Sequence, residues 1–298
     1  MKSGFVGIVG RPNVGKSTLM NSMLGEKIAI TSNKAQTTRN AIRGIYTKTD
    51  AEGEPVCQLV FIDTPGIHKP KNALGSYMTD TALSTLKEVD AVLFLVDSEY
   101  EGEKSGDEFI IKALKEIDTP KYLIINKIDK INPESYLNIF NYYDNLGIFK
   151  DIIGTNALEG KNVDVVLSRL EEHASEGPMF FPADMITDHP ERFLVFEIIR
   201  EKLLMYLNEE VPHGVAVEIE SYEEKGNLTR ISALIYCEKQ SHKGIIIGKQ
   251  GHTLKGIGKA AREEIEALIG TKVFLEIFVK VKEGWRESTI AISNFGYK

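Results

Sequence analysis

The chain has 298 residues, of which 42% are hydrophobic and 27% are charged. These values are typical of globular proteins and exclude a disordered, collagen-like or coiled-coil chain, and the length predicts two domains. The net charge of −7 is unevenly spread, because residues 239–298 carry 11 Lys and Arg against 6 Glu and residues 2–48 carry eight basic residues against one acidic residue. Two basic regions in an acidic protein indicate two anionic ligands, or an uneven scatter of solvated side chains.

The apolar runs are short: residues 91–96 are about as long as a strand and fall well below the roughly 18 residues of a membrane-spanning helix. The residues after Met1 lack the pattern of a signal peptide. We therefore expect no transmembrane segment and no export. Cys57 and Cys237 lie in separate strand-like patterns, which favours buried free thiols in a reducing compartment.

Short apolar runs alternate with helix-like stretches through about residue 172, and their spacing leaves room for crossover helices. The expected strands are residues 5–9, 58–63, 91–97, 122–126 and 151–155. This alternation predicts an α/β domain with a mostly parallel sheet and flanking helices over residues 1–174.

Regular periodicity stops between residues 175 and 190, where glycines and prolines break helix and strand alike, and we place a linker there. Beyond it the pattern predicts a helix, two strands, a glycine-interrupted helical stretch and a long strand. Their expected ranges are 193–207, 214–221, 229–238, 242–269 and 272–282. This α-β-β-α-α-β order predicts a small α+β domain over residues 191–298, with helices on one face of a three-stranded sheet.

The segment Gly-Arg-Pro-Asn-Val-Gly-Lys-Ser at residues 10–17 fits the pattern G-x-x-x-x-G-K-[ST], between an expected strand and an expected helix. Its glycines let backbone N–H groups point at a phosphate, Lys16 would add a positive charge at the β- and γ-phosphates, and Ser17 would offer a hydroxyl to Mg²⁺. This P-loop pattern predicts a nucleotide site but leaves ATP and GTP open. The expected contacts are Gly10, Asn13, Val14, Gly15, Lys16, Ser17 and Thr18.

A second element, Asp-Thr-Pro-Gly at residues 63–66, follows the second expected strand. Asp63 would reach Mg²⁺ through water, and Gly66 would bring its N–H close to the γ-phosphate. Residues 36–39 offer hydroxyls for the metal shell, or form a solvated loop without a ligand role. We expect catalysis to involve Lys16, Thr38, Asp63 and Gly66, with Ser17, Thr38 and Asp63 as the Mg²⁺ ligands.

The segment Asn-Lys-Ile-Asp at residues 126–129 ends the fourth expected strand and favours guanine as the base. Asp129 would accept hydrogen bonds from N1–H and the exocyclic amino group of guanine, Asn126 would donate to N7, and the stem of Lys127 would cover the ring. Adenine has neither donor, so it would leave the carboxylate unpaired, and such sites discriminate by up to about 10⁴–10⁵.

With these motifs in order, about 170 N-terminal residues resemble a small translation-factor-class GTPase. The resemblance implies a fifth element, usually Ser-Ala-Leu, that contacts the guanine; here it reads Asn156, Ala157 and Leu158. Asn at the usual Ser position leaves the main-chain contact intact but removes any support that depends on a hydroxyl.

Ile67 stands where Ras-like enzymes place a water-orienting glutamine, and an aliphatic side chain cannot orient water. We therefore expect slow intrinsic turnover. Asn13 matches the loop asparagine of potassium-stimulated GTPases, which implies a K⁺ ion beside the transferring phosphate.

A Gly-x-x-Gly turn at residues 248–251 joins two expected helices in the basic C-terminal region. Together with the order of elements, it resembles a KH domain, which clamps about four nucleotides of single-stranded nucleic acid. A plain helix-turn-helix corner is the alternative. The expected RNA contacts are Lys243, Ile246, Gly248, Lys249, Gln250, Gly251 and Lys255.

A GTPase domain followed by a KH domain resembles the Era family over essentially the whole chain. The resemblance implies a monomeric, cytoplasmic GTPase that binds the 3′ region of small-subunit (16S) ribosomal RNA and acts in assembly of the small ribosomal subunit. GTP and Mg²⁺ would order residues 31–40 and 63–75. Peripheral contact with the cell membrane stays open. The rival hypotheses are an RNA-binding assembly protein with a merely structural nucleotide site, and a P-loop metabolic kinase, which would leave residues 126–129 without a role.

Overall fold

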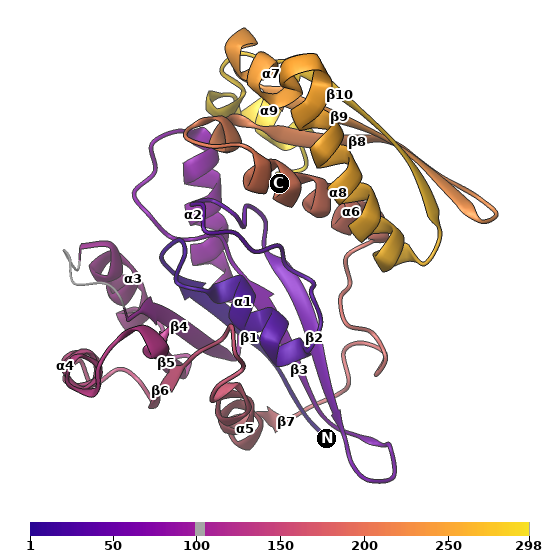
Figure 1. Ribbon diagram of the computed structural model, residues 1–298. Coiled ribbons are helices and arrows are strands. Elements are labelled where there is room, and N and C mark those ends of the chain that lie inside the picture. Colours follow the sequence, from indigo (N-terminus) through magenta and orange to yellow (C-terminus); the bar gives the residue numbers. More distant parts are fainter. Residues whose placement is uncertain (99–104, 298) are drawn as a thin grey trace. The chain divides into compact units, whose positions relative to one another are not determined.

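Figure 1 shows the computed structural model of the chain, which describes residues 1–98 and 105–297. The chain divides into two compact units. The first comprises Met1–Thr31, Thr38–Pro70 and Gly75–Asp188, and the second comprises Ser32–Thr37, Lys71–Leu74 and His189–Lys298. Parts of both segments that we expect to respond to nucleotide therefore group with the second unit.

The first unit is built on one mixed sheet in the order β2-β3-β1-β4-β5-β6, with β7 paired to β1. Its strands are β1 (Lys2–Gly10), β2 (Ile42–Thr49), β3 (Pro55–Asp63), β4 (Ala91–Asp97), β5 (Lys121–Asn126), β6 (Asp151–Thr155) and β7 (Ser175–Glu176). Five of them run parallel, while β2 and β7 are antiparallel to their neighbours. Each of the five predicted strands is present. Strand β2 was not predicted; it is an edge strand whose burial is mixed.

Helices cover both faces of this sheet (Figure 1). They are α1 (Lys16–Leu24), α2 (Ala73–Thr85), α3 (Ser105–Lys115), the short η1 (Ile128–Lys130), α4 (Pro133–Asp144) and α5 (Val163–His173). Side chains of α2, α3 and α4 join a core with the apolar residues of β4 and β5. Helices α1 and α5 pack against each other. The carboxyl ends of the parallel strands thus meet at one edge, where ligands bind in open α/β sheets.

The expected linker begins as β7 and then packs on the first unit. Gln58, which is fully buried, accepts hydrogen bonds from the N–H groups of Phe180 and Phe181 at 2.8 and 3.0 Å. Further along, the N–H of Ile45 in β2 donates to the carbonyl of Ile186 at 2.9 Å. These bonds satisfy main-chain groups that regular structure leaves unpaired, so this segment is fixed although it has no periodicity.

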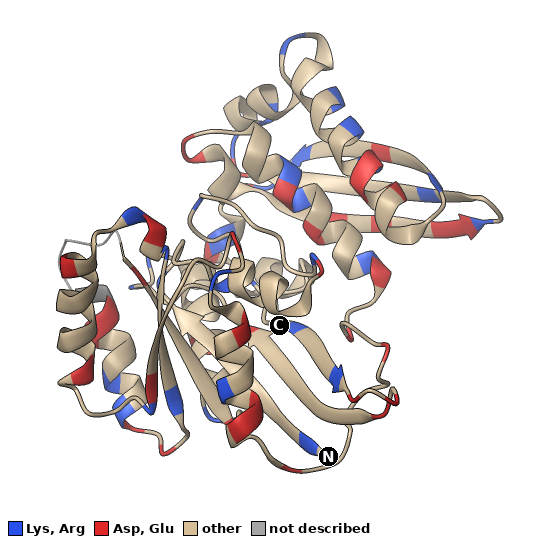
Figure 2. Ribbon diagram, turned by 60° about the horizontal axis from the view of Figure 1, so that its bottom comes forward, with Lys and Arg blue, Asp and Glu red and all other residues tan. Residues whose placement is uncertain are grey.

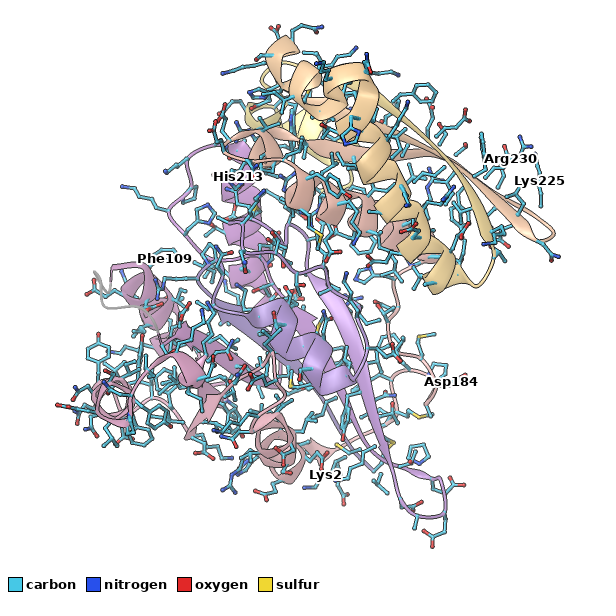
Figure 3. All side chains as sticks on the ribbon, viewed as in Figure 1. Lys2, Phe109, Asp184, His213, Lys225 and Arg230 are labelled. Atoms are coloured by element: carbon cyan, nitrogen blue, oxygen red, sulfur yellow. The ribbon has the colours of Figure 1, made fainter. Side chains whose placement is uncertain are left out.

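The second unit is a three-stranded sheet, in the order β10-β9-β8, with helices packed on it. Its elements are α6 (Glu191–Tyr206), η2 (Val211–Gly214), β8 (Ala216–Lys225), β9 (Leu228–Cys237), α7 (Gln240–Ile247), η3 (Lys249–Gly251), α8 (His252–Ile269), β10 (Lys272–Val281), η4 (Trp285–Glu287) and α9 (Thr289–Asn294). Lys225 and Arg230 lie near the tip of the β8–β9 hairpin (Figure 3). The short α9 was not predicted. Among the described residues, no helix has the length and apolar character needed to cross a bilayer.

Candidate functional site

The phosphate loop lies between the end of β1 and the start of α1. Lys16 opens the helix and is buried, and its Nζ donates to the carbonyl oxygens of Gly10 at 3.2 Å and Arg11 at 2.9 Å. Burial lowers the pKa of Lys16 to about 8, and the nearby Asp63 carboxylate partly opposes this shift. A buried ammonium group held by main-chain carbonyls would gain from an anion, because a charge taken out of water needs an opposite charge beside it.

Gly15 is the point at which the loop turns into the helix. Its φ of 102° lies in the left-handed region, and a Cβ at this position would lie 2.2 Å from Nδ2 of Asn126. No side chain fits there without displacing Asn126. The glycine therefore permits the phosphate loop to touch residues 126–129, the predicted base-reading motif.

Three oxygen-bearing side chains meet at the start of α1. The Ser17 hydroxyl donates to Oδ2 of Asp63 at 2.6 Å and lies 2.9 Å from the hydroxyl of Thr38, which donates to the same Oδ2 at 3.2 Å. Asp63 and Thr38 are buried. Two hydroxyls and a carboxylate are hard ligands of the kind that Mg²⁺ prefers, and they converge from three separate segments. The residues present therefore fit a magnesium ion that also takes ligands from phosphate.

The segment after Asp63 is fastened beside the phosphate loop. The Thr64 hydroxyl donates to the carbonyl of Ile8 at 2.8 Å, and the N–H of Ile67 donates to the carbonyl of Gly10 at 3.1 Å. Gly66 lies so close to Pro12 that a Cβ would be 2.7 Å from the Pro12 Cα. Ile67 is fully buried in the core, so the side chain at the expected water-orienting position packs inside the protein.

Asn126 connects three of the motifs. Its Nδ2 donates to the carbonyl of Val14 at 2.8 Å, and its Oδ1 accepts from the hydroxyl of Thr155 at 3.2 Å and the N–H of Ala157 at 3.0 Å. Asn126 is 3% exposed, so these bonds form away from water. The sequence pattern predicts a contact between Asn126 and the base but does not indicate these bonds to the other motifs.

After Asn126, the side chain and carbonyl of Lys127 are fixed by contacts, and Asp129 remains exposed. Lys127 has a φ of 61°, and its Nζ forms an ion pair with Oδ2 of Asp97 at 2.6 Å, which holds its aliphatic stem in place. The Ser98 hydroxyl donates to the carbonyl of Lys127 at 2.6 Å. Asp129 is exposed, as a carboxylate that is to meet a base must be.

Asn156 supports its loop without a hydroxyl. Its Oδ1 accepts from the N–H groups of Leu158 at 3.2 Å and Glu159 at 3.3 Å, and its main chain exchanges both hydrogen bonds with Lys161. The amide oxygen thus supplies support that a serine hydroxyl would give. Ala157 is buried, whereas Leu158 is 86% exposed.

The glycine-rich turn of the second unit, residues 248–251, is more exposed than the phosphate loop. Gly248 has φ 71° and ψ 174°, and Gln250 and Gly251 are left-handed with φ values of 52° and 76°. Lys249 and Gln250 are exposed, and so is Lys255 in the first turns of α8. The turn therefore presents main chain and basic side chains outward.

One of the predicted RNA contacts lies inside the protein. Ile246 is fully buried, because α7 turns this residue toward the core of the second unit. The neighbouring Ile245 is 50% exposed. Lys243 is half-buried. Figure 2 shows Lys and Arg interspersed with Asp and Glu in both units, so net charge alone would not have located this turn.

Comparisons with known proteins agree with this geometry. The family model described as 50S ribosome-binding GTPase matches residues 5–127, and the KH domain model matches residues 210–286. The chain is 56% identical to GTPase Era of Alkaliphilus metalliredigens (strain QYMF), with 100% of this chain and 99% of that protein covered. It is 53% identical to GTPase Era of Clostridioides difficile (strain 630), with 99% of this chain and 98% of that protein covered.

Two solved structures resemble the whole chain. A variant of Aquifex aeolicus Era bound to GDP.AlF4⁻ is 40% identical, with a TM-score of 0.94. Era in complex with MgGDPNP and nucleotides 1506–1542 of 16S ribosomal RNA is 41% identical, with a TM-score of 0.93. Each alignment covers 100% of this chain and 99% of the other chain.

Proposed function

The chain belongs to the Era family of GTPases, and from this premise we propose that it is a GTP-driven switch that binds the 3′ region of small-subunit ribosomal RNA during assembly of that subunit. The observation that carries the proposal is the full-length similarity to the Era structure that contains MgGDPNP and 16S ribosomal RNA nucleotides. The chain has counterparts of both halves of that arrangement, a phosphate loop and a Gly-x-x-Gly turn.

At the phosphate end, Ser17, Thr38 and Asp63 would hold Mg²⁺, which neutralises charge on the phosphates when it is bound. Lys16 would exchange its two main-chain acceptors for the β- and γ-phosphates, and the N-terminus of α1 would add its partial positive charge. Gly66 would donate its N–H to the γ-phosphate. Once these groups surround the phosphates, little further reorganisation would accompany the reaction.

At the base end, Asp129 would accept from guanine, Lys127 would cover the ring, and Asn126 would use its second amide hydrogen at N7. The main chain of residues 156–158 would contact the guanine oxygen. Discrimination against adenine follows from leaving a carboxylate without its two donors.

Hydrolysis needs a group that does the work of the missing glutamine. Ile67 is buried and apolar, so it cannot hold a water molecule. Asn13 is exposed at the tip of the phosphate loop, and we propose that it helps to hold K⁺ near the transferring phosphate. Turnover in potassium buffer should exceed turnover in sodium buffer, and equal rates would contradict the role of K⁺.

At the RNA end, the turn at residues 248–251 would let a single-stranded backbone approach the N-terminus of α8. Lys249 and Lys255 would meet phosphates, and Ile245 would contact a base. GTP should favour the RNA-competent state, and RNA should strengthen GTP binding by the same factor.

The test measures binding of a short single strand from the 3′ end of the rRNA to the full-length protein, with GTP analogue, with GDP and without nucleotide. The wild type is compared with Gly248→Asp/Gly251→Asp. Gly226→Asp serves as the control, because Gly226 lies in an open turn of the same unit with a φ of 61°. Binding that needs both glycines and GTP analogue supports the proposal. Equal RNA binding in all nucleotide states contradicts the switch. A separate assay measures multiple-turnover GTP hydrolysis, and its absence would favour a purely structural nucleotide site.

A further inference from the structure

Arg11, the second residue of the phosphate loop, has its side chain directed into the protein. Its Nε forms an ion pair with Oδ1 of Asp107 at 2.8 Å, and the two side chains are 17% and 2% exposed. The other oxygen of Asp107 accepts a hydrogen bond from the hydroxyl of Tyr143 at 3.1 Å. Asp107 lies in the first turn of α3 and Tyr143 lies near the end of α4, so this cluster joins the phosphate loop to two helices.

The cluster is specific rather than a chance surface contact. In the same helix, Phe109 is 50% exposed and points outward (Figure 3), whereas Asp107 is turned inward despite its charge. Burial raises the pKa of Asp107, and Arg11 and the Tyr143 hydroxyl act against that shift. A buried carboxylate with a donor on each oxygen is costly to break, because removing one donor leaves a charge without a partner.

Arg11 carries main-chain atoms that belong to the site. Its carbonyl accepts from Nζ of Lys16 at 2.9 Å. The next residue, Pro12, lies against Gly66, and Asn13 follows with a φ of 66°. Fixing the Arg11 side chain therefore fixes residues 11–13, which form one arm of the loop. This arm carries the carbonyl that accepts from Lys16, and it carries Pro12, which lies against Gly66.

We propose that Asp107 and Tyr143 are positioning residues for nucleotide binding, which act through Arg11 to hold this arm of the phosphate loop in its ligand-ready conformation. Because the cluster orders this arm before the nucleotide binds, the free energy of ordering it does not weaken the nucleotide affinity. It also joins the phosphate loop to α4, the helix that follows the base-reading motif. The inference rests on the proposed role of the phosphate loop.

The experiment measures the affinity and dissociation rate of a fluorescent GDP and a fluorescent GTP analogue with the full-length protein. The variants are Arg11→Ala, Arg11→Lys, Asp107→Asn, Tyr143→Phe and Arg11→Ala/Asp107→Asn. Arg169→Ala is the matched control, because Arg169 forms an exposed ion pair with Asp151 in the same unit, at 3.0 Å. All measurements are made at a temperature at which the thermal unfolding curve of each variant shows it to be folded.

We expect Arg11→Ala and Asp107→Asn each to weaken nucleotide binding about tenfold or more, because small displacements of a positioned group are costly. Tyr143→Phe removes one hydrogen bond and should cost about two- to tenfold. Arg11→Lys should recover part of the loss. The double variant should bind no more weakly than Arg11→Ala, because both changes break one connection.

Three results would overturn the inference. Unchanged affinity in Asp107→Asn and Tyr143→Phe, with a loss in Arg11→Ala alone, would mean that Arg11 touches the nucleotide directly. Additive losses in the double variant would mean that the two residues act separately. Lower melting temperatures with unchanged affinity would mean that the cluster only stabilises the fold. In each case tight binding by the wild type would leave the proposed nucleotide site intact.

Discussion

The phosphate loop and the Gly248–Gly251 turn contain similar residues, but the lysine is buried in the loop and exposed in the turn. Both combine two glycines with a lysine, which follows Gly15 in the phosphate loop and lies between Gly248 and Gly251 in the turn. The lysine of the phosphate loop is 6% exposed, and the loop is hydrogen-bonded to Asn126 more than a hundred positions away. In the turn, Lys249 and Gln250 are exposed, and no residue of η3 is buried.

The difference reflects what each site must recognise. A buried network fixes donors and acceptors before the ligand arrives, so it can reject a base that lacks one partner. An exposed turn with glycine at its ends offers close approach and charge to a nucleic-acid backbone, which is the same for every sequence. Substitutions should therefore act on the first site through broken contacts and on the second through blocked access.

Gly15→Ala should have the largest effect, because it introduces a Cβ 2.2 Å from Nδ2 of Asn126 at a φ of 102°. Displacing Asn126 breaks its bonds to Val14, Thr155 and Ala157 together, so we expect nucleotide affinity to fall by about a hundredfold or more. Titration with fluorescent GDP measures this loss.

The matched control is Gly25→Ala at the other end of α1. Gly25 has a φ of 71°, and a Cβ there meets nothing within 4 Å. It should cost about 1 kcal/mol of stability through backbone strain and leave nucleotide affinity unchanged. Equal affinities in the two variants would mean that the contact with Asn126 does not hold the site together.

Gly248→Ala should have the next largest effect and should act on RNA only. A Cβ at Gly248 would lie 2.2 Å from Oγ1 of Thr253 and 2.9 Å from the Thr253 backbone nitrogen, whereas at Gly251 it would meet only Lys255 at 3.9 Å. We expect RNA affinity to fall about tenfold or more in Gly248→Ala and only a few-fold in Gly251→Ala. Filter binding measures both. A greater loss in Gly251→Ala would show that steric fit at Gly248 does not control access.

The sequence predicts the buried parts of this molecule better than its edges. Central parallel strands are apolar over most of their length, which is why the predicted strands 91–97 and 122–126 match the observed β4 and β5. The parallel edge strand β6 was also predicted, because its pattern has no charged residue after Asp151. Strand β2 mixes apolar residues with Arg43 and Lys48, because an edge strand is half exposed, and its pattern resembles a loop.

The candidate site was predictable where a motif fixes the residue type, and less so where the fold decides. Ser17, Thr38 and Asp63 meet as their motifs suggested. The bond from Asn126 to Val14 depends on the strand order β1-β4-β5, which local patterns do not contain. The burial of Ile246 was not predictable, because three consecutive isoleucines in a short helix leave its buried side undefined.

The buried lysine also predicts a pH dependence. The pKa of Lys16 is lowered from 10.5 to about 8 by burial, so the unfolded chain binds more protons than the folded protein between these values. The stability of the nucleotide-free protein should therefore gain from Lys16 as pH rises through this range. A bound phosphate favours the charged lysine and raises its pKa, so nucleotide binding takes up a proton above pH 8.

Nucleotide affinity should accordingly fall as pH rises, by about tenfold at about pH 9 relative to about pH 7. Calorimetry in buffers of different ionisation enthalpy measures the protons taken up on binding, and uptake should increase across this interval. Binding without proton uptake at pH 8 would contradict a neutralisable Lys16.

Substitution of Asn156 should have the smallest effect on nucleotide affinity. This residue lies at the end of the buried hydrogen-bond network, where the loop becomes exposed as the Gly248–Gly251 turn is. Its Oδ1 supports the N–H groups of Leu158 and Glu159 at 3.2 and 3.3 Å, which are long hydrogen bonds, and Leu158 beside them is 86% exposed. Asn156→Ala should therefore weaken GDP binding only about two- to fivefold, through a loop that is ordered less well. Asn156→Ser restores a side-chain acceptor, although one bond shorter, and should stay within about twofold of the wild type. If both variants bind GDP equally weakly, the amide of Asn156 makes a contact that a hydroxyl cannot replace. The buried hydrogen-bond network would then extend beyond Ala157.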